Sequence, residues 1–188
     1  MHEVDDWELV ARAQTGEVEA FSLLVRRYQG PVIHFCQRMT GSQEDAEDLA
    51  QEAFVRLHRY LRRLQPRARF STVLFGIARN LTLNFLRDAK RRGRGRAVPI
   101  EGRPLPDTAS GQPDQRARLH EIEAVLEQGI AMLSADHREV LVLREIQGLD
   151  YESIAQVVRC RKGTVRSRLA RAREQLRRHV QELGGDLL

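Results

Sequence analysis

The sequence predicts an all-α protein with two small helical domains joined by a flexible linker, the second domain containing a helix-turn-helix. Apolar residues recur every three or four positions along most of the chain, and no stretch alternates as a strand would. A segment rich in Gly, Pro and Arg, residues 92–114, separates two complete sets of helical patterns. Of the 188 residues, 5% are aromatic and 30% are charged, which suits small helical domains with wide solvated faces. We therefore expect domains over residues 1–91 and 115–188.

Charge is strongly segregated along the chain, although the net charge is only +5. Residues 1–55 carry eleven acids and four bases, and residues 56–103 carry fourteen bases and two acids. Residues 159–178 carry nine bases and one acid. This order predicts one surface for a protein partner and two for nucleic acid.

Several classes of protein are disfavoured. No apolar run reaches membrane-spanning length and the N-terminus is acidic, so we expect a cytoplasmic protein. The two cysteines, Cys36 and Cys160, are too few for a disulfide framework or a zinc site.

The first domain begins with short helical patterns. One helix is expected from Trp7 to Ala13, and another begins after Gly16. Gly30-Pro31 is expected to interrupt the second helix, because proline lacks a backbone donor and disfavours helix in the residue before it. The pattern resumes at Val32 and ends at Gly41.

A long helix with two unlike faces follows, and Ser42 is expected to cap it. Its apolar face consists of Ala46, Leu49, Ala50, Ala53, Phe54, Leu57 and Leu61. Its other face consists of Glu44, Asp45, Asp48, Gln51, Glu52 and the lone apolar Val55. Such a face is either simply solvated or a site for a basic protein partner.

A basic loop and helix complete the first domain. Pro66 indicates a loop, and a helix is expected from Thr72 to about Arg91 with Ser71 as its cap. Asn80 and Asn84 lie one turn apart on this helix. Because mid-helix asparagine is a weak helix former, the pair indicates either two ordinary surface amides or a functional use.

The second domain is expected to begin with a helix at Gln115. Ser134 should cap the next helix, which is expected to bury Ile146 and to carry Arg138 and Arg144 on its outside.

Two further helices joined by a short turn follow, with Gly148 closing the preceding helix and Asp150 capping the first of the two. The second helix places one apolar stripe inward: Val165, Leu169, Ala172, Leu176 and Val180. Ser167, Ala170 and Arg171 then point outward, and Arg166 flanks the stripe. This arrangement is typical of a DNA-binding helix-turn-helix, the alternative being an amphipathic helix with a solvated basic face.

Four segments carry a resemblance to a known family. The runs REIQGLDYESIA, residues 144–155, and GTVRSRLARAR, residues 163–173, resemble domain 4 of an extracytoplasmic-function (ECF) sigma factor of bacterial RNA polymerase. DAEDLAQEAF, residues 45–54, resembles the segment of such factors that docks on the clamp helices of the largest polymerase subunit. FSTVLFGIARN, residues 70–80, resembles the segment that reads the promoter −10 element.

The resemblance implies a sigma factor that binds core RNA polymerase and directs it to promoters by reading −10 and −35 elements. It implies core polymerase, promoter DNA and an anti-sigma factor as partners, with no membrane insertion, catalytic site, cofactor or metal. The implied polymerase-binding residues are Asp45, Asp48, Gln51, Glu52 and Val55. The implied −10 residues are Leu64, Arg69, Phe70, Arg79, Asn80, Asn84, Arg87 and Lys90. The implied −35 residues are Arg144, Lys162, Thr164, Arg166, Ser167, Ala170 and Arg171.

Three features depart from the family pattern. The helix-turn-helix turn, residues 159–163, reads Arg-Cys-Arg-Lys-Gly where the family commonly has a proline, and its added charge should strengthen phosphate contacts. Val73 stands where many relatives have Trp, and Ala170 stands where some have a larger side chain.

Other functions explain less of the chain. A stand-alone helix-turn-helix regulator would account for the C-terminal third but not for the acidic helix or the basic helix after Phe70. A nucleic-acid enzyme would need paired carboxylates, a Gly-rich phosphate loop or a His/Cys cluster, and the sequence shows none of these patterns. A helical adaptor that binds only protein does not explain the nine basic residues between Arg159 and Arg178.

Overall fold

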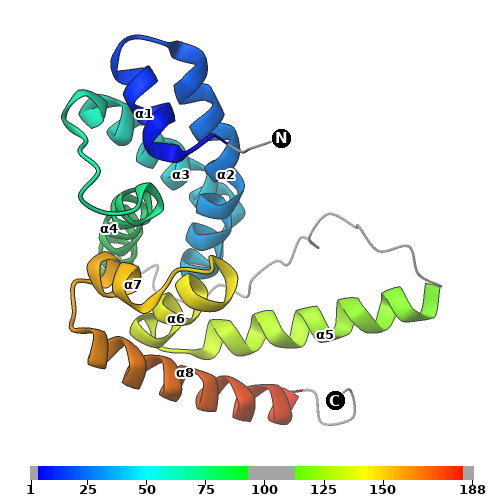
Figure 1. Cartoon of the computed structure of the whole chain (residues 1–188). Helices are drawn as coiled ribbons and strands as arrows, with labels where there is room; N and C mark the ends of the chain where they lie inside the picture. The colour runs from blue at the N-terminus through cyan, green and yellow to red at the C-terminus, as the bar shows by residue number, and fades with distance from the viewer. Residues whose placement is uncertain (1–3, 93–112, 184–188) are drawn as a thin grey trace.

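The structure is a computed structural model that describes residues 4–92 and 113–183. Within these residues it contains helices and no strand, so the predicted all-α fold class is confirmed. The elements are α1 (Asp6–Gln14), α2 (Val18–Thr40), α3 (Gln43–Tyr60), a short 3-10 helix η1 (Leu61–Arg63), α4 (Phe70–Arg91), α5 (Pro113–Met132), α6 (Ala135–Leu141), a π-helical segment η2 (Val142–Ile146), α7 (Tyr151–Val158) and α8 (Lys162–Leu183) (Figure 1). Apart from its two ends, the predicted linker lies outside the described residues.

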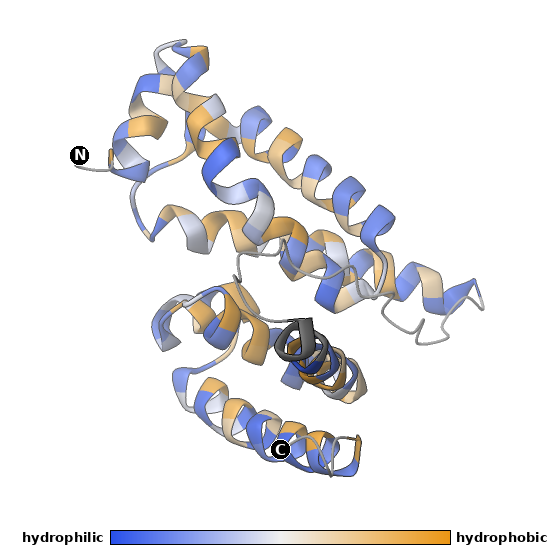
Figure 2. Ribbon diagram, turned by 90° about the vertical axis from the view of Figure 1, so that its right-hand side faces the viewer, coloured by the Kyte–Doolittle hydropathy of each residue, from blue (hydrophilic) through white to orange (hydrophobic). Residues whose placement is uncertain are grey.

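The helices form two groups, α1–α4 and α5–α8, which Figure 2 shows one above the other. In the first group, α2 packs on α1, α3 and α4; in the second, α8 packs on α5, α6 and α7. The two groups meet mainly where α4 packs on α7, and α2 also contacts α5 and α6. No helix within the two described ranges combines the length and the apolar composition needed to cross a membrane.

Helix α2 is continuous, so the predicted interruption at Gly30-Pro31 is wrong. Leu24 before the proline and Val32 and Phe35 after it are all 0% exposed. Proline inside a helix costs about 3 kcal/mol. Burying each of these large side chains contributes about 1.5–3 kcal/mol, so the shared core outweighs the lost hydrogen bond.

Helix ends follow the predicted caps where a side chain can reach the backbone. The Ser42 hydroxyl accepts from the Asp45 N–H at 3.2 Å, and the Asp150 carboxylate accepts from the Ser153 N–H at 2.7 Å. Gly41, with φ of 80°, ends α2 in the left-handed conformation that favours glycine.

One predicted cap is wrong, and another is confirmed in its position but not in its side-chain bond. Helix α4 begins at Phe70 with Arg69 as its N-cap residue, so Ser71 lies inside the helix. The reason is tertiary: Phe70 is only 1% exposed, and its burial brings the start of the helix to residue 70, two positions earlier than predicted. Ser134 precedes α6 as expected, but its side chain makes no capping bond; its carbonyl accepts from the Arg138 N–H at 2.8 Å.

Side-chain directions around α6 and η2 also differ from prediction. Arg138, expected outside, points inward and donates to the carbonyl oxygens of Ile130 at 3.1 Å, Leu133 at 3.0 Å and Met39 at 3.2 Å. Burial lowers the pKa of its guanidinium. Ile146, expected to be buried, is 39% exposed. A π-helical turn holds more residues than an α-helical one, so residues in η2 leave the face that a 3.6-residue period assigns.

Candidate nucleic-acid and polymerase interfaces

The predicted helix-turn-helix is present, formed by α7, a turn at residues 159–161 and α8. Arg159 ends α7 with φ of 56°, a left-handed conformation that glycine adopts more easily. The N–H groups of Arg159 and Cys160 both bond to the Ala155 carbonyl. On the inner side of α8, Val165 and Ala172 are fully buried, which fixes the direction of the opposite face.

The outer face of α8 presents the side chains that the apolar stripe predicted would point outward. Ser167, Ala170 and Arg171 are exposed, and so is Arg166, which flanks the stripe. Thr164 is half-buried, and its carbonyl accepts from the Ser167 hydroxyl at 3.0 Å. An exposed guanidinium can bond to a guanine edge, and a small methyl can touch a thymine methyl, so this face has the chemistry of direct base reading.

Two basic side chains beside this face have intramolecular partners. The Lys162 ammonium lies 3.7 Å from a Glu152 carboxylate oxygen, with both side chains about half exposed or more. Arg144 is half-buried and donates to the Leu149 carbonyl at 2.8 Å. Lys162 therefore remains accessible to a phosphate, whereas Arg144 is held close to the start of α7.

The loop between η1 and α4, residues 64–69, is anchored by α1. The Gln14 side-chain amide donates to the carbonyls of Leu61 at 2.9 Å and Leu64 at 3.0 Å. The Trp7 indole donates to the Ala68 carbonyl at 3.0 Å. Neither Trp7 nor Gln14 was predicted to act here, since their positions in the sequence give no sign of this contact. Together they hold the segment that contains the predicted −10 residues.

Phe70 lies behind this loop. Its ring meets Trp7 edge-on at a centroid distance of 6.2 Å and lies 5.3 Å from the ring of Tyr28. At 1% exposure it supports the loop from inside, and its ring does not face solvent in this conformation. Leu64 is half-buried and Arg69 is exposed, so both can be reached from outside.

The solvent side of α4 carries the other predicted −10 residues. Asn80 is half-buried, and Asn84, Arg87 and Lys90 are exposed. Positions 80, 84 and 87 follow one another at helical spacing, so an amide pair and a cation share one side of the helix. Amides can pair with base edges and cations with phosphates, as binding of a separated strand requires.

Arg79 is engaged within the chain. Its guanidinium donates to both carboxylate oxygens of Glu139, at 2.7 and 3.0 Å. The side chains are 13% and 1% exposed, and the pair joins α4 to α6. Burial raises the pKa of Glu139, and the hydrogen bonds from Arg79 oppose that rise. In this arrangement Arg79 forms an ion pair between the two helical groups, and its contact with DNA stays a prediction.

Arg69 makes a weaker link of the same kind. Its guanidinium lies 3.2 Å from the Asp150 carboxylate, with side chains 70% and 43% exposed. The pKa of Asp150 is lowered chiefly by the hydrogen bond from the Ser153 backbone and to a smaller extent by Arg69. An ion pair this exposed contributes little, about 0–1 kcal/mol, so Arg69 can exchange it for a phosphate.

The predicted polymerase-binding face lies along α3. Asp48, Gln51 and Val55 are exposed, and Asp45 and Glu52 are half-buried. Glu52 also pairs with Arg56 at 2.7 Å, one turn further along. The face therefore presents both charge and an apolar side chain, as the sequence indicated.

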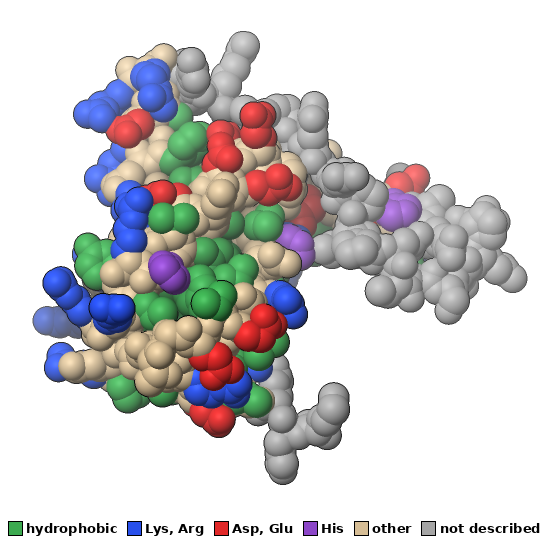
Figure 3. Space-filling model, turned by 90° about the horizontal axis from the view of Figure 1, so that it is seen from above, with side chains coloured by type: hydrophobic (Ala, Val, Ile, Leu, Met, Phe, Trp, Pro, Cys, Tyr) green, Lys and Arg blue, Asp and Glu red, His purple; other side chains and the backbone are tan. Residues whose placement is uncertain are grey.

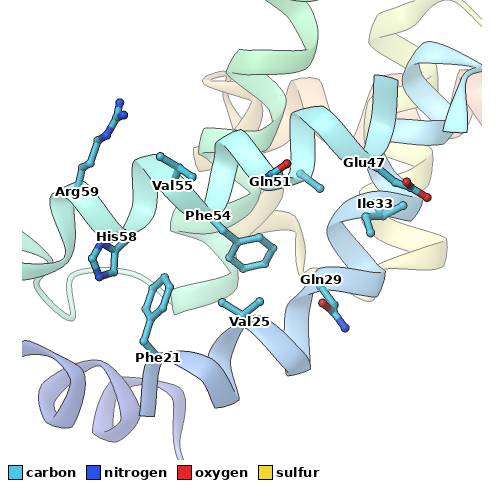
Figure 4. A pocket seen from close by; sticks show the side chains of 11 residues that line it. Phe21, Val25, Gln29, Ile33, Glu47, Gln51, Phe54, Val55, His58 and Arg59 are labelled. Carbon is cyan, nitrogen blue, oxygen red and sulfur yellow. The ribbon is translucent and has the colours of Figure 1, made fainter. Parts of the chain in front are cut away.

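An apolar hollow of about 470 Å³ lies between α2 and α3 beside this face. Phe21 and Val25 of α2 and Phe54 and Val55 of α3 line it, together with Gln51 (Figure 4). Figure 3 looks down onto the α1 end and shows hydrophobic side chains exposed in the middle of this view, with Lys and Arg along its left edge. Gln51 and Val55 belong to both the hollow and the predicted face, so the two form one continuous surface.

Comparisons with known proteins match both helical groups. The model of sigma-70 region 2 matches residues 24–92, and that of sigma-70 region 4 matches residues 123–176. The RNA polymerase sigma-H factor of Pseudomonas aeruginosa is 39% identical over 185 residues, covering 95% of each chain. The ECF RNA polymerase sigma-E factor of Escherichia coli is 36% identical over 186 residues, covering 96% of this chain and 97% of that one.

A solved structure shows the same fold. The sigma factor RpoE of Bartonella quintana, in complex with the anti-sigma factor NepR, has a TM-score of 0.68 and 24% identity, covering 86% of this chain and 96% of that one. The sequence relatives match nearly the whole chain. The region 2 match lies in the group α1–α4, and the region 4 match lies in the group α5–α8. The chain therefore belongs to the sigma-70 family of RNA polymerase sigma factors and is of the ECF type.

Proposed function

We propose that this sigma factor binds core RNA polymerase through α3 and directs it to promoters with a −10 element read by α4 and a −35 element read by α8. One observation supports this most directly: helix α8, which follows the turn of the helix-turn-helix, has an exposed face formed by Arg166, Ser167, Ala170 and Arg171. A stand-alone regulator would use the same face, but it would have no need of the acidic α3 face or of the amide pair on α4.

The three surfaces have different tasks. The acidic side chains of α3 and the neighbouring hollow suit a basic coiled coil with apolar anchors, since opposite charge steers association and apolar contact adds affinity. On α4, Asn80 and Asn84 would hold unstacked bases of the melted strand, with Leu64 as an apolar wall and Arg87 and Lys90 on phosphates.

The chain is expected to act as a recognition subunit in the cytoplasm, without catalysis of its own. Its partners are core polymerase, promoter DNA and, as in the Bartonella complex, an anti-sigma factor. The amide and guanidinium groups assigned to the promoter provide binding and orientation, and they need neither a cofactor nor a metal ion.

Run-off transcription tests the function as a whole. The purified chain is mixed with core polymerase and a library of duplex promoters, and start sites are mapped. Defined starts that require both components are expected. Binding of the chain to duplex DNA at specific sites with no effect on the polymerase would instead favour the stand-alone regulator.

A comparison of two substitutions tests the division of labour in the −35 region. Arg166→Ala should flatten the preference among −35 variants, because a lost bidentate contact removes about 1–3 kcal/mol of discrimination. Lys162→Ala should weaken all variants about equally and reduce the dependence of affinity on salt. Identical affinity profiles for the two variants would contradict this assignment.

Asn80→Ala tests the −10 assignment separately. It should reduce open-complex formation, followed by permanganate reactivity of unpaired thymines, more than it reduces affinity for core polymerase. Normal opening by this variant would leave Asn80 as a surface amide.

A further inference from the structure

Tyr151 is the first residue of α7, where the helix-turn-helix begins. Its ring is half-buried and packs against the apolar core, so its position is fixed from behind. The neighbouring Asp150 caps the helix, which fixes the backbone at the same point. Sequence reasoning assigned no role to Tyr151.

Two of the arginines assigned to the −35 element converge on this ring. The guanidinium carbon of Arg144 lies 5.0 Å from the ring centroid, and that of Arg166 lies 5.9 Å from it. The two come from different elements, Arg144 from η2 and Arg166 from α8. Both distances are within the range of about 6 Å in which an aromatic face attracts a cation.

A third arginine is fixed beside the same ring. Arg173 donates to Glu145 at 2.5 and 3.1 Å. Its pKa is raised chiefly by Glu145, with smaller contributions from Tyr151. The cationic groups around Tyr151 therefore come from η2 and from two positions of α8 that are seven residues apart. Of the three arginines, only Arg173 has a carboxylate partner among the described contacts.

We infer that Tyr151 is a positioning residue for −35 recognition, whose ring is a platform that holds the guanidinium groups of Arg144 and Arg166 ready for base edges. This role rests on the proposed function of α8. A free arginine side chain has many rotamers, and part of this rotamer entropy is lost when it forms a bidentate bond. A side chain already resting on a ring loses less of that entropy on binding.

The size of the effect follows from the strength of the ring contact. An exposed cation–π contact is worth about 0.5–1 kcal/mol, which corresponds to about a two- to fivefold loss of preference for each arginine released. Arg171 lies on the same helix face, and no ring contact is recorded for it among the described residues. Bases read by Arg171 should therefore be unaffected, which provides an internal control.

The test uses holoenzyme assembled from the full chain and core polymerase, with duplex promoters randomised upstream of a fixed −10 region. The positions read by Arg166 are defined as those whose preference is lost in Arg166→Ala. Tyr151→Leu removes the ring and keeps apolar bulk, and it should reduce preference at those positions about two- to fivefold. Tyr151→Phe keeps the ring and should stay within about twofold of the unsubstituted protein.

Two outcomes of this selection would overturn the inference. The first outcome is that Tyr151→Leu keeps the full base preference at the positions where Arg166→Ala has lost that preference. The other is equal loss in Tyr151→Phe and Tyr151→Leu, which would mean that the hydroxyl acts on DNA directly. Melting of each variant is followed by circular dichroism, and Tyr151→Met replaces Tyr151→Leu if the latter does not fold.

A measurement without DNA separates the platform from the function on which it rests. In proton NMR of the free protein, the side-chain protons of Arg144 and Arg166 should show ring-current shifts in the unsubstituted chain and in Tyr151→Phe, and lose them in Tyr151→Leu. Absence of these shifts in the unsubstituted chain would overturn the platform. Normal shifts combined with an Arg166→Ala variant of unchanged −35 preference would instead overturn the assignment of α8, and with it this role for Tyr151.

Discussion

Replacing Arg79 with alanine is expected to release the contact between the two helical groups. Arg79 of α4 and Glu139 of α6 form a bidentate ion pair at 2.7 and 3.0 Å across this contact. The positions −10 and −35 differ by about 25 base pairs, which corresponds to about 85 Å of duplex. Two packed domains of this size span far less than that distance. Under the proposed function the groups must therefore separate before both elements can be read, and this ion pair opposes the separation.

The free-energy cost of Arg79→Ala follows from the burial of the Arg79–Glu139 pair. Glu139 is 1% exposed and Arg79 13%, so removing the guanidinium leaves a carboxylate away from water. Breaking a buried pair from one side costs about 3–5 kcal/mol. Arg168 remains 3.7 Å from Glu139 and compensates in part. We therefore expect the lower end, about 3 kcal/mol, which shifts the equilibrium between closed and open forms by about 150-fold.

The chain offers its own probes for the assay. Trp7 is the single tryptophan, and a dye on Cys160 can accept its fluorescence energy. The other cysteine, Cys36, is buried. Arg79→Ala should lower the energy transfer from Trp7 to the dye, because α7 and the turn that follows it leave α4.

Two further variants separate the ion pair from a general charge effect. Arg87→Ala removes the same charge from an exposed position on α4 and should leave the transfer unchanged. Adding Glu139→Gln to Arg79→Ala removes the buried charge and should restore part of the closed form. Equal transfer in Arg79→Ala and in the unsubstituted chain, at matched melting temperatures, would refute the reasoning.

Three more outcomes are expected. Asp48→Lys should weaken binding to core polymerase in a pull-down, with the largest difference at low salt because exposed charges are screened, while the circular dichroism spectrum stays unchanged. A Cβ at Gly129 would lie 2.9 Å from Leu176. Gly129→Ala should change the free energy of unfolding in urea by less than about 1 kcal/mol, because the better helix propensity of alanine offsets the crowding. Gly129→Val should lower this free energy by about 2 kcal/mol, because the larger side chain overpacks the contact. Iodoacetamide at pH 7 should modify Cys160 and spare Cys36, because burial raises the pKa of the Cys36 thiol to about 11. Rapid modification of Cys36, which mass spectrometry would detect, would contradict its burial.

The sequence alone determined the features that depend on neighbours within one helical turn. The apolar stripe of α8 predicted that Ser167, Ala170 and Arg171 point outward, and all three are exposed. Ser42 and Asp150 were predicted caps and make the expected bonds. Periodicity and capping act between residues three or four positions apart, so they can be read from the order of residues.

Only the tertiary structure decided which side chains meet across the fold. Arg79 and Glu139 are 60 positions apart, and Trp7 and Ala68 are 61 apart. A local pattern records that a position is polar, but it does not record which distant group will face it after packing. For this reason the pairing of Arg79 with Glu139 could not be predicted.

The same distinction explains the two largest misreadings of local structure. Pro31 has the properties of a helix breaker, but the buried residues on both sides keep α2 continuous. Arg138 has the properties of a surface residue, but the carbonyl groups that end α2 and α5 supply enough acceptors to satisfy it inside. Propensity contributes up to about 3 kcal/mol at one position, and a packed core contributes comparable amounts at several positions together. Local preference therefore determined which helices form in this protein. Packing decided where a helix continues and which side chains are buried against that preference.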